Sequence, residues 1–125
     1  MPHTDNHGTR IAYEVIAGTG PPLILHHGLS DSSRGWHDGG YVAALRRDCT
    51  LVLIDARGHG ESTKPHEPEA YHPPEVLATD VLAVMDALFI EDAHYFGYSM
   101  GGRVGFELAR RAPGRLRSLV LGGAH

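Results

Sequence analysis

The serine of the segment Gly97-Tyr98-Ser99-Met100-Gly101 is the side chain that its neighbours best equip to act as a nucleophile. An apolar run at 93–98 precedes it, and a segment of helical character at 100–111 follows it. A serine on a sharp turn from strand to helix projects its hydroxyl beyond the sheet, and the helix start favours developing negative charge. The same residues also fit a glycine-rich turn with a solvated serine, but the flanking elements favour the nucleophile.

Two other glycine-containing segments follow short apolar runs in the same manner. His26-His27-Gly28-Leu29 comes after the run 23–25, and the segment 55–62 comes after the run 51–54. In open parallel sheets, ligands bind beyond the carboxyl ends of the strands. We therefore expect these two segments and the Ser99 turn to meet at one rim of a sheet.

The elements that must position these segments alternate between strand and helix. Short continuous apolar runs, typical of strands buried on both faces, occupy 23–25, 51–54, 93–98 and 116–121. Pro73 and Pro74 suit a helix start, and apolar residues then recur at helical spacing through 77–88. This alternation predicts an α/β fold with a mostly parallel sheet and helices on both faces.

Two further segments, one after Ser99 and one near the N-terminus, allow predictions about helix packing and strand position. The segment after Ser99 contains Gly101, Gly102 and Gly105, which weaken a helix and so indicate that it approaches a strand closely. Near the N-terminus, the segment 10–16 alternates between apolar and polar residues and runs into a Gly-Pro turn. It is predicted to be an antiparallel edge strand.

Composition restricts the class of protein. The 125 residues carry a net charge of −4, with 42% hydrophobic and 21% charged residues, which suits one globular domain and makes nucleic acid an unfavoured partner. The single cysteine, Cys49, cannot form an internal disulfide. The polar segment 1–10 and the lack of a long apolar run predict a cytoplasmic protein without membrane association. The spacing of the ten histidines predicts no metal site.

Taken together, in this order and spacing, the three glycine-containing segments resemble the α/β-hydrolase fold from about Arg10 onward. The resemblance implies that Ser99 is the nucleophile and that the backbone N–H groups of Leu29 and Met100 form an oxyanion hole. It also implies that His27, Gly28 and Tyr98 contact the substrate and that no cofactor is required.

A serine, rather than an aspartate, at the nucleophile position indicates acyl transfer among the members of this family. The resemblance therefore implies a small-molecule ester or lactone substrate, hydrolysed through an acyl-enzyme at Ser99. The alternative is a non-catalytic α/β module that keeps the pocket and binds a small apolar ligand or a partner chain.

The polar residues around these segments have more ordinary interpretations. His26 and His27 could touch a substrate, although a histidine in this turn more often bonds neighbouring loops and holds the oxyanion backbone. Asp55 and Arg57 could pair and fix the loop that contains His59, and we leave them out of the catalytic set.

The general base and its orienting acid are not evident in the sequence. The family order places both after Ser99, where this chain offers only Glu107, within the following helix, and the terminal His125. We therefore expect residues 1–125 to be the N-terminal portion of one hydrolase domain, truncated after the strand that ends near Leu121. That strand would then be an exposed sheet edge through which chains could associate, leaving the isolated chain poorly folded or oligomeric.

Overall fold

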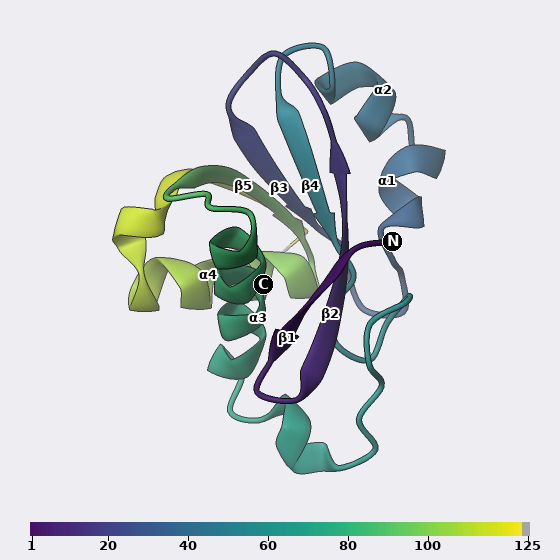
Figure 1. The fold of residues 1–125 in the computed structure, drawn as a ribbon, viewed down its shortest axis with the longest axis vertical. Helices are drawn as coiled ribbons and strands as arrows, with labels where there is room; N and C mark the ends of the chain where they lie inside the picture. The colour runs from purple at the N-terminus through teal and green to yellow at the C-terminus, as the bar shows by residue number, and fades with distance from the viewer. Residues whose placement is uncertain (124–125) are drawn as a thin grey trace.

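Six strands form one sheet in the order β1-β2-β4-β3-β5-β6 in the computed structural model, which describes residues 1–123 (Figure 1). The strands are β1 (His3–Asn6), β2 (Thr9–Ile16), β3 (Pro22–His26), β4 (Thr50–Ile54), β5 (Ala93–Tyr98) and β6 (Leu116–Gly122). β3 to β6 run parallel to one another, whereas β1 and β2 are antiparallel to their neighbours. The predicted mostly parallel sheet is confirmed.

Helices cover both faces of this sheet, as Figure 1 shows. They are α1 (Arg34–Asp38), α2 (Tyr41–Leu45), α3 (Glu75–Ala87) and α4 (Met100–Arg111), with single 3₁₀ turns η1 (Pro68–Tyr71) and η2 (Pro113–Arg115). Because side chains alternate along a strand, β3 and β4 contribute to two separate cores. Leu25 packs with Trp36 of α1 on one face, and Ile24 packs with Val81 of α3 on the other.

The predicted edge position of the segment 10–16 is wrong. β2 lies between β4 and β1, and β1 is the edge strand. The two strands form a hairpin through His7 and Gly8, both of which have positive φ angles, 50° and 91°. β1 is polar and only half-buried, so it lacks the hydrophobic pattern by which a strand is detected.

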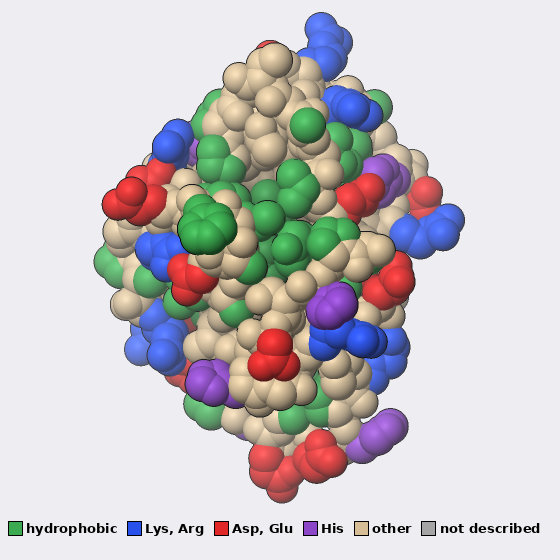
Figure 2. All heavy atoms as spheres, in the orientation of Figure 1, with side chains coloured by type: hydrophobic (Ala, Val, Ile, Leu, Met, Phe, Trp, Pro, Cys, Tyr) green, Lys and Arg blue, Asp and Glu red, His purple; other side chains and the backbone are tan. Residues whose placement is uncertain are grey.

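β6 forms the opposite edge and, within the described residues, pairs only with β5. Its Val120 side chain is 53% exposed. On the face drawn in Figure 2, hydrophobic side chains gather near the middle and charged side chains of both signs lie around them. Across residues 1–123, each helix is too short or too polar to span a bilayer.

α3 ends in a hydrogen-bonding pattern that usually requires glycine. The Ile90 amide donates to the Met85 carbonyl at 2.9 Å and the Phe89 amide donates to the Asp86 carbonyl at 3.1 Å, which is a Schellman motif. Phe89 occupies the left-handed position with φ of 56°, and its side chain is 96% exposed. The helix is thus terminated by an aromatic residue that the core does not bury.

Candidate active site

Ser99 joins β5 to α4 in a strained conformation. Its φ of 53° and ψ of −111° lie in a region that side chains other than glycine rarely adopt. Three hydrogen bonds hold it there: its amide donates to the Gly122 carbonyl at 2.7 Å, and its carbonyl accepts the amides of Gly102 and Arg103 at 2.9 and 3.1 Å. Such strain costs about 1–3 kcal/mol and persists only where surrounding contacts impose it.

Glycines on either side of Ser99 allow the start of α4 to rest on the strands. A Cβ atom on Gly97 would lie 2.2 Å from the Gly101 carbonyl oxygen, and one on Gly101 would lie 2.1 Å from the His26 carbonyl oxygen. The buried Tyr95 hydroxyl donates to the same Gly101 carbonyl at 2.7 Å. The predicted close approach of this helix to the sheet is therefore confirmed, and it places Ser99 beside the end of β3.

The segment after β3 lies against the Ser99 turn. A Cβ atom on Gly28 would lie 3.4 Å from the Ser99 Cβ. Met100 is the first residue of α4, where an amide has no acceptor within the helix. Among the described residues, neither the Leu29 amide nor the Met100 amide has a hydrogen-bond acceptor. The structure thus brings both predicted oxyanion-hole segments to Ser99.

A cavity of about 190 Å³ opens beside this junction. The three residues predicted to contact substrate, His27, Gly28 and Tyr98, all line it. The rest of its wall consists of Asp31, Gly35, Trp36, Tyr41 and Phe96. The ring of Trp36 packs edge-on against that of Tyr41, with centroids 5.2 Å apart. Trp36 of α1 therefore packs against Tyr41 of α2 and also lines the cavity. Phe96 and Tyr41 are wall residues that sequence reasoning missed.

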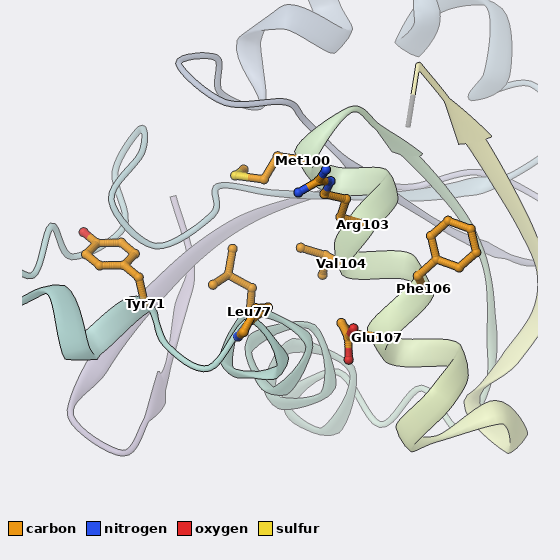
Figure 3. Close-up of a pocket in the computed structure, with 8 residues that line it drawn as sticks. Tyr71, Leu77, Met100, Arg103, Val104, Phe106 and Glu107 are labelled. Atoms are coloured by element: carbon orange, nitrogen blue, oxygen red, sulfur yellow. The ribbon is translucent and has the colours of Figure 1, made fainter. Parts of the chain in front are cut away.

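A second cavity of about 480 Å³ lies between η1, α3 and α4 (Figure 3). Its wall includes Tyr71 of η1, Leu77 of α3, and Met100 and Val104 of α4. Figure 3 shows the Met100 side chain extending from the Ser99 turn toward Tyr71. The sequence gives no sign of this cavity, because it depends on how η1 and α3 sit against α4.

The interpretation that Asp55 and Arg57 pair is wrong. The Asp55 carboxylate accepts the backbone amides of Ser33 at 2.8 Å and Glu61 at 3.0 Å. Arg57 instead forms a bidentate ion pair with Asp80 of α3 through Nε and Nη2, both at 2.7 Å, and both side chains are almost fully buried. Asp55 turns toward the loop amides, and the longer Arg57 side chain reaches the helix.

His26 and His27 are buried and neutral. Burial, followed by the nearby His27, lowers the pKa of His26 to about 3. Burial also lowers the pKa of His27, whose Nε2 accepts the Ala56 amide at 3.0 Å. The expectation that a histidine in this turn bonds a neighbouring loop is confirmed. His125, the other histidine considered above, lies outside the described residues, and within 1–123 no three His, Cys, Asp or Glu side chains are grouped to hold a metal.

The arrangement suits attack of a hydroxyl on a carbonyl carbon. A serine on a strained turn, two amides that find no acceptor within residues 1–123 and an aromatic cavity meet at one rim. A sequence model described as alpha/beta hydrolase fold matches residues 21–125. RutD of Azorhizobium caulinodans, a protein named for carbamate hydrolysis, is 34% identical over 121 residues, which is 97% of this chain and 43% of RutD.

Two solved structures share the fold at the same identity. A hydrolase from Pseudomonas aeruginosa PA01 superposes with a TM-score of 0.89 and 34% identity over 97% of this chain and 44% of its own. The enol-lactonase from Burkholderia xenovorans LB400 gives 0.85 and 34%, over 94% of this chain and 45% of its own. The chain thus spans less than half the length of each of these three proteins. With the matching segments, sheet order and turn geometry described above, the chain belongs to the alpha/beta hydrolase fold family.

Proposed function

We propose that this protein is a serine hydrolase that cleaves carboxylic esters or lactones through an acyl-enzyme at Ser99. The observation that carries the proposal is the backbone of Ser99, which stays in the left-handed region although it is not glycine. Backbone strain of this kind clusters at functional sites, and here it turns a nucleophilic side chain toward the rim of the sheet.

In the proposed reaction, the Ser99 hydroxyl attacks the substrate carbonyl carbon and gives its proton to a general base. The carbonyl oxygen becomes negatively charged and accepts the Leu29 and Met100 amides, each worth about 2.7–4 kcal/mol in the transition state. The tetrahedral intermediate collapses, the alcohol oxygen leaves with a proton, and water then hydrolyses the acyl-enzyme. With a lactone, the alcohol and the acyl group belong to the same chain.

The general base is assigned to residues outside 1–123. Among the described residues, the Ser99 hydroxyl has no hydrogen-bond partner, and both ring nitrogens of His27 are engaged with backbone groups. We therefore propose that residues 1–125 are the N-terminal part of a single hydrolase domain. The coverage of 43% to 45% of three relatives supports this assignment.

The cavity lined by His27, Gly28 and Tyr98 is proposed to receive the acyl portion of the substrate. Its aromatic wall favours an apolar group, and Gly28 leaves that group access to Ser99. The likeness to the enol-lactonase supports esters and lactones as the substrate class.

A fluorophosphonate probe tests the proposal in the product of the native gene, purified at its natural length. Mass spectrometry is expected to find the label on Ser99, with labelling lost in Ser99→Ala and kept in Ser118→Ala, which alters an exposed serine of β6. The unlabelled protein should hydrolyse p-nitrophenyl acetate or a γ-lactone, and this activity should be lost once Ser99 is labelled. A folded gene product that binds apolar ligands but is never labelled at Ser99 would establish the non-catalytic alternative.

A further inference from the structure

The segment 28–30, which carries one of the two proposed oxyanion amides, has no apolar anchor. The Leu29 side chain is 71% exposed, and Ser30 has a φ of 66°. Packing therefore does not fix this segment, and its position depends on hydrogen bonds.

One histidine ring orients the peptide that contains the Leu29 amide. The Gly28 carbonyl and the Leu29 N–H belong to the same planar trans peptide and point in opposite directions. His27 Nδ1–H donates to the Gly28 carbonyl at 2.7 Å, and the Asp31 amide donates to it at 3.2 Å. These bonds direct the Leu29 N–H away from His27 and polarise the peptide, which strengthens the N–H as a donor.

A second ring, from the loop after β4, holds the other end of the segment. The Ser30 amide donates to His59 Nε2 at 3.1 Å, and His59 Nδ1–H donates to the Arg57 carbonyl at 3.1 Å. The rings of His27 and His59 lie 5.1 Å apart. Since Nε2 of each ring accepts a backbone N–H, each ring is neutral and carries its proton on Nδ1.

We propose that His59 is a positioning residue that fixes the segment 28–30 for oxyanion stabilisation and releases it when its ring is protonated. The inference rests on the proposed function, in which the Leu29 amide receives the oxyanion. Protonation of His59 would place an N–H opposite the Ser30 N–H, so the bond that holds the segment is lost. His59 does not touch substrate and acts only through Ser30.

The charges around the two rings are of both signs. Burial lowers the pKa of His27 and outweighs the hydrogen bond to the Gly28 carbonyl, which raises it. A charge on His59 lowers this pKa further, and the Asp55 and Asp31 carboxylates raise it. His26, whose ring centroid is 5.5 Å from that of His27, stays neutral through burial.

NMR spectra of the ¹⁵N-labelled product of the native gene test the proposal without any need for activity. Imidazole nitrogen shifts near neutral pH are expected to show the Nδ1–H form of both His59 and His27. On acidification, the Ser30 and Leu29 amide signals should move with the same midpoint as the His59 ring. His59→Leu should shift both amides and speed Ser30 hydrogen exchange, whereas His59→Gln, whose Oε1 can accept the amide, should restore them. His66→Leu is the matched control at an exposed histidine.

In the product of the native gene, His59→Leu should slow phosphonylation of Ser99 by about 10-fold or more, because a misplaced oxyanion donor loses part of the roughly 100-fold or more that one such donor contributes. His59→Gln should recover the rate. Unmoved Ser30 and Leu29 amides in His59→Leu, or a wild-type His59 ring protonated on Nε2, would overturn the proposal. If His59→Leu does not fold, the wild-type tautomer and titration decide the question. A protein in which the amides respond but Ser99 is never labelled refutes the proposed function and leaves the positioning role intact.

Discussion

Replacing His26 with asparagine is expected to remove a large part of the loss of stability in acid. The His26 ring is 1% exposed, and its Nδ1–H donates to the His27 carbonyl at 3.2 Å. Its pKa is about 3 in the folded chain and 6.5 in the reference state, so the unfolded chain binds more protons between these values. The neutral His26 ring therefore costs the fold no stability above pH 6.5. As the pH falls from 6.5 toward 3, protonation of this ring in the unfolded chain lowers the free energy of unfolding.

The magnitude follows from proton linkage. A pKa difference contributes about 1.4 kcal/mol per pH unit where only the unfolded state is protonated, so lowering the pH from about 7.5 to about 4.5 costs roughly 3 kcal/mol through His26. In His26→Asn the side-chain amide can still donate to the His27 carbonyl but cannot titrate. The free energy of unfolding of the variant should therefore fall by about 3 kcal/mol less than that of the wild type over this interval.

Urea denaturation at a series of pH values measures this difference. Trp36, the one tryptophan in the sequence, is 5% exposed and reports unfolding through its fluorescence. The comparison uses the change in the free energy of unfolding with pH. An equal loss of stability at every pH in His26→Asn therefore does not affect it. His66→Asn, at an exposed histidine, should follow the wild-type slope. Parallel slopes for the wild type and His26→Asn would show that the burial argument is wrong.

Three further substitutions test the packing around the site. Asp80→Asn should lower the free energy of unfolding by about 3 kcal/mol, because it leaves a buried arginine without its ion pair. The control Asp92→Asn alters an exposed ion pair and should cost less than about 1 kcal/mol. Equal urea midpoints for the two variants would contradict this prediction. Gly101→Ala should prevent formation of the native fold and so abolish the cooperative urea transition, because its Cβ would lie 2.1 Å from a carbonyl oxygen. The control Gly114→Ala has open space around its Cβ and should unfold like the wild type. Phe89→Gly should raise the free energy of unfolding by about 1 kcal/mol by relieving left-handed strain, and a lower urea midpoint would show that the exposed ring contributes to stability.

The strands could be predicted because β3 and β4 are buried on both faces and, like β5, read as short apolar runs bounded by glycine or polar residues. The turn at Ser99 could be predicted because Gly97 and Gly101 lie so close to backbone oxygens that a side chain would not fit there. The glycines therefore mark the turn in the sequence. β1 could not, because its polar residues form a strand only through the hairpin with β2. The Arg57 partner was missed because Asp80 is 23 residues away on α3, and only the placement of that helix selects it over nearby Asp55.

The link between His59 and Ser30 was out of reach for the same physical reason. These residues are 29 positions apart, and a histidine in a glycine-rich loop carries no signal of which backbone amide it will accept. The resemblance to a family predicts which segments meet at the rim, but the individual hydrogen bonds depend on loop conformations that a pattern does not encode.

The contact between the start of α4 and the ends of β3 and β5 is made by backbone atoms, through Gly97 and Gly101. The Tyr95 hydroxyl supports this contact from the core by donating to the Gly101 carbonyl at 2.7 Å, and the surfaces that touch are those of the two glycines. Trp36, Phe96 and Tyr98 vary the cavity wall from outside it. In evolutionary terms, the position of Ser99 and the shape of the neighbouring cavity can be inherited independently, and a change of ligand need not move the serine.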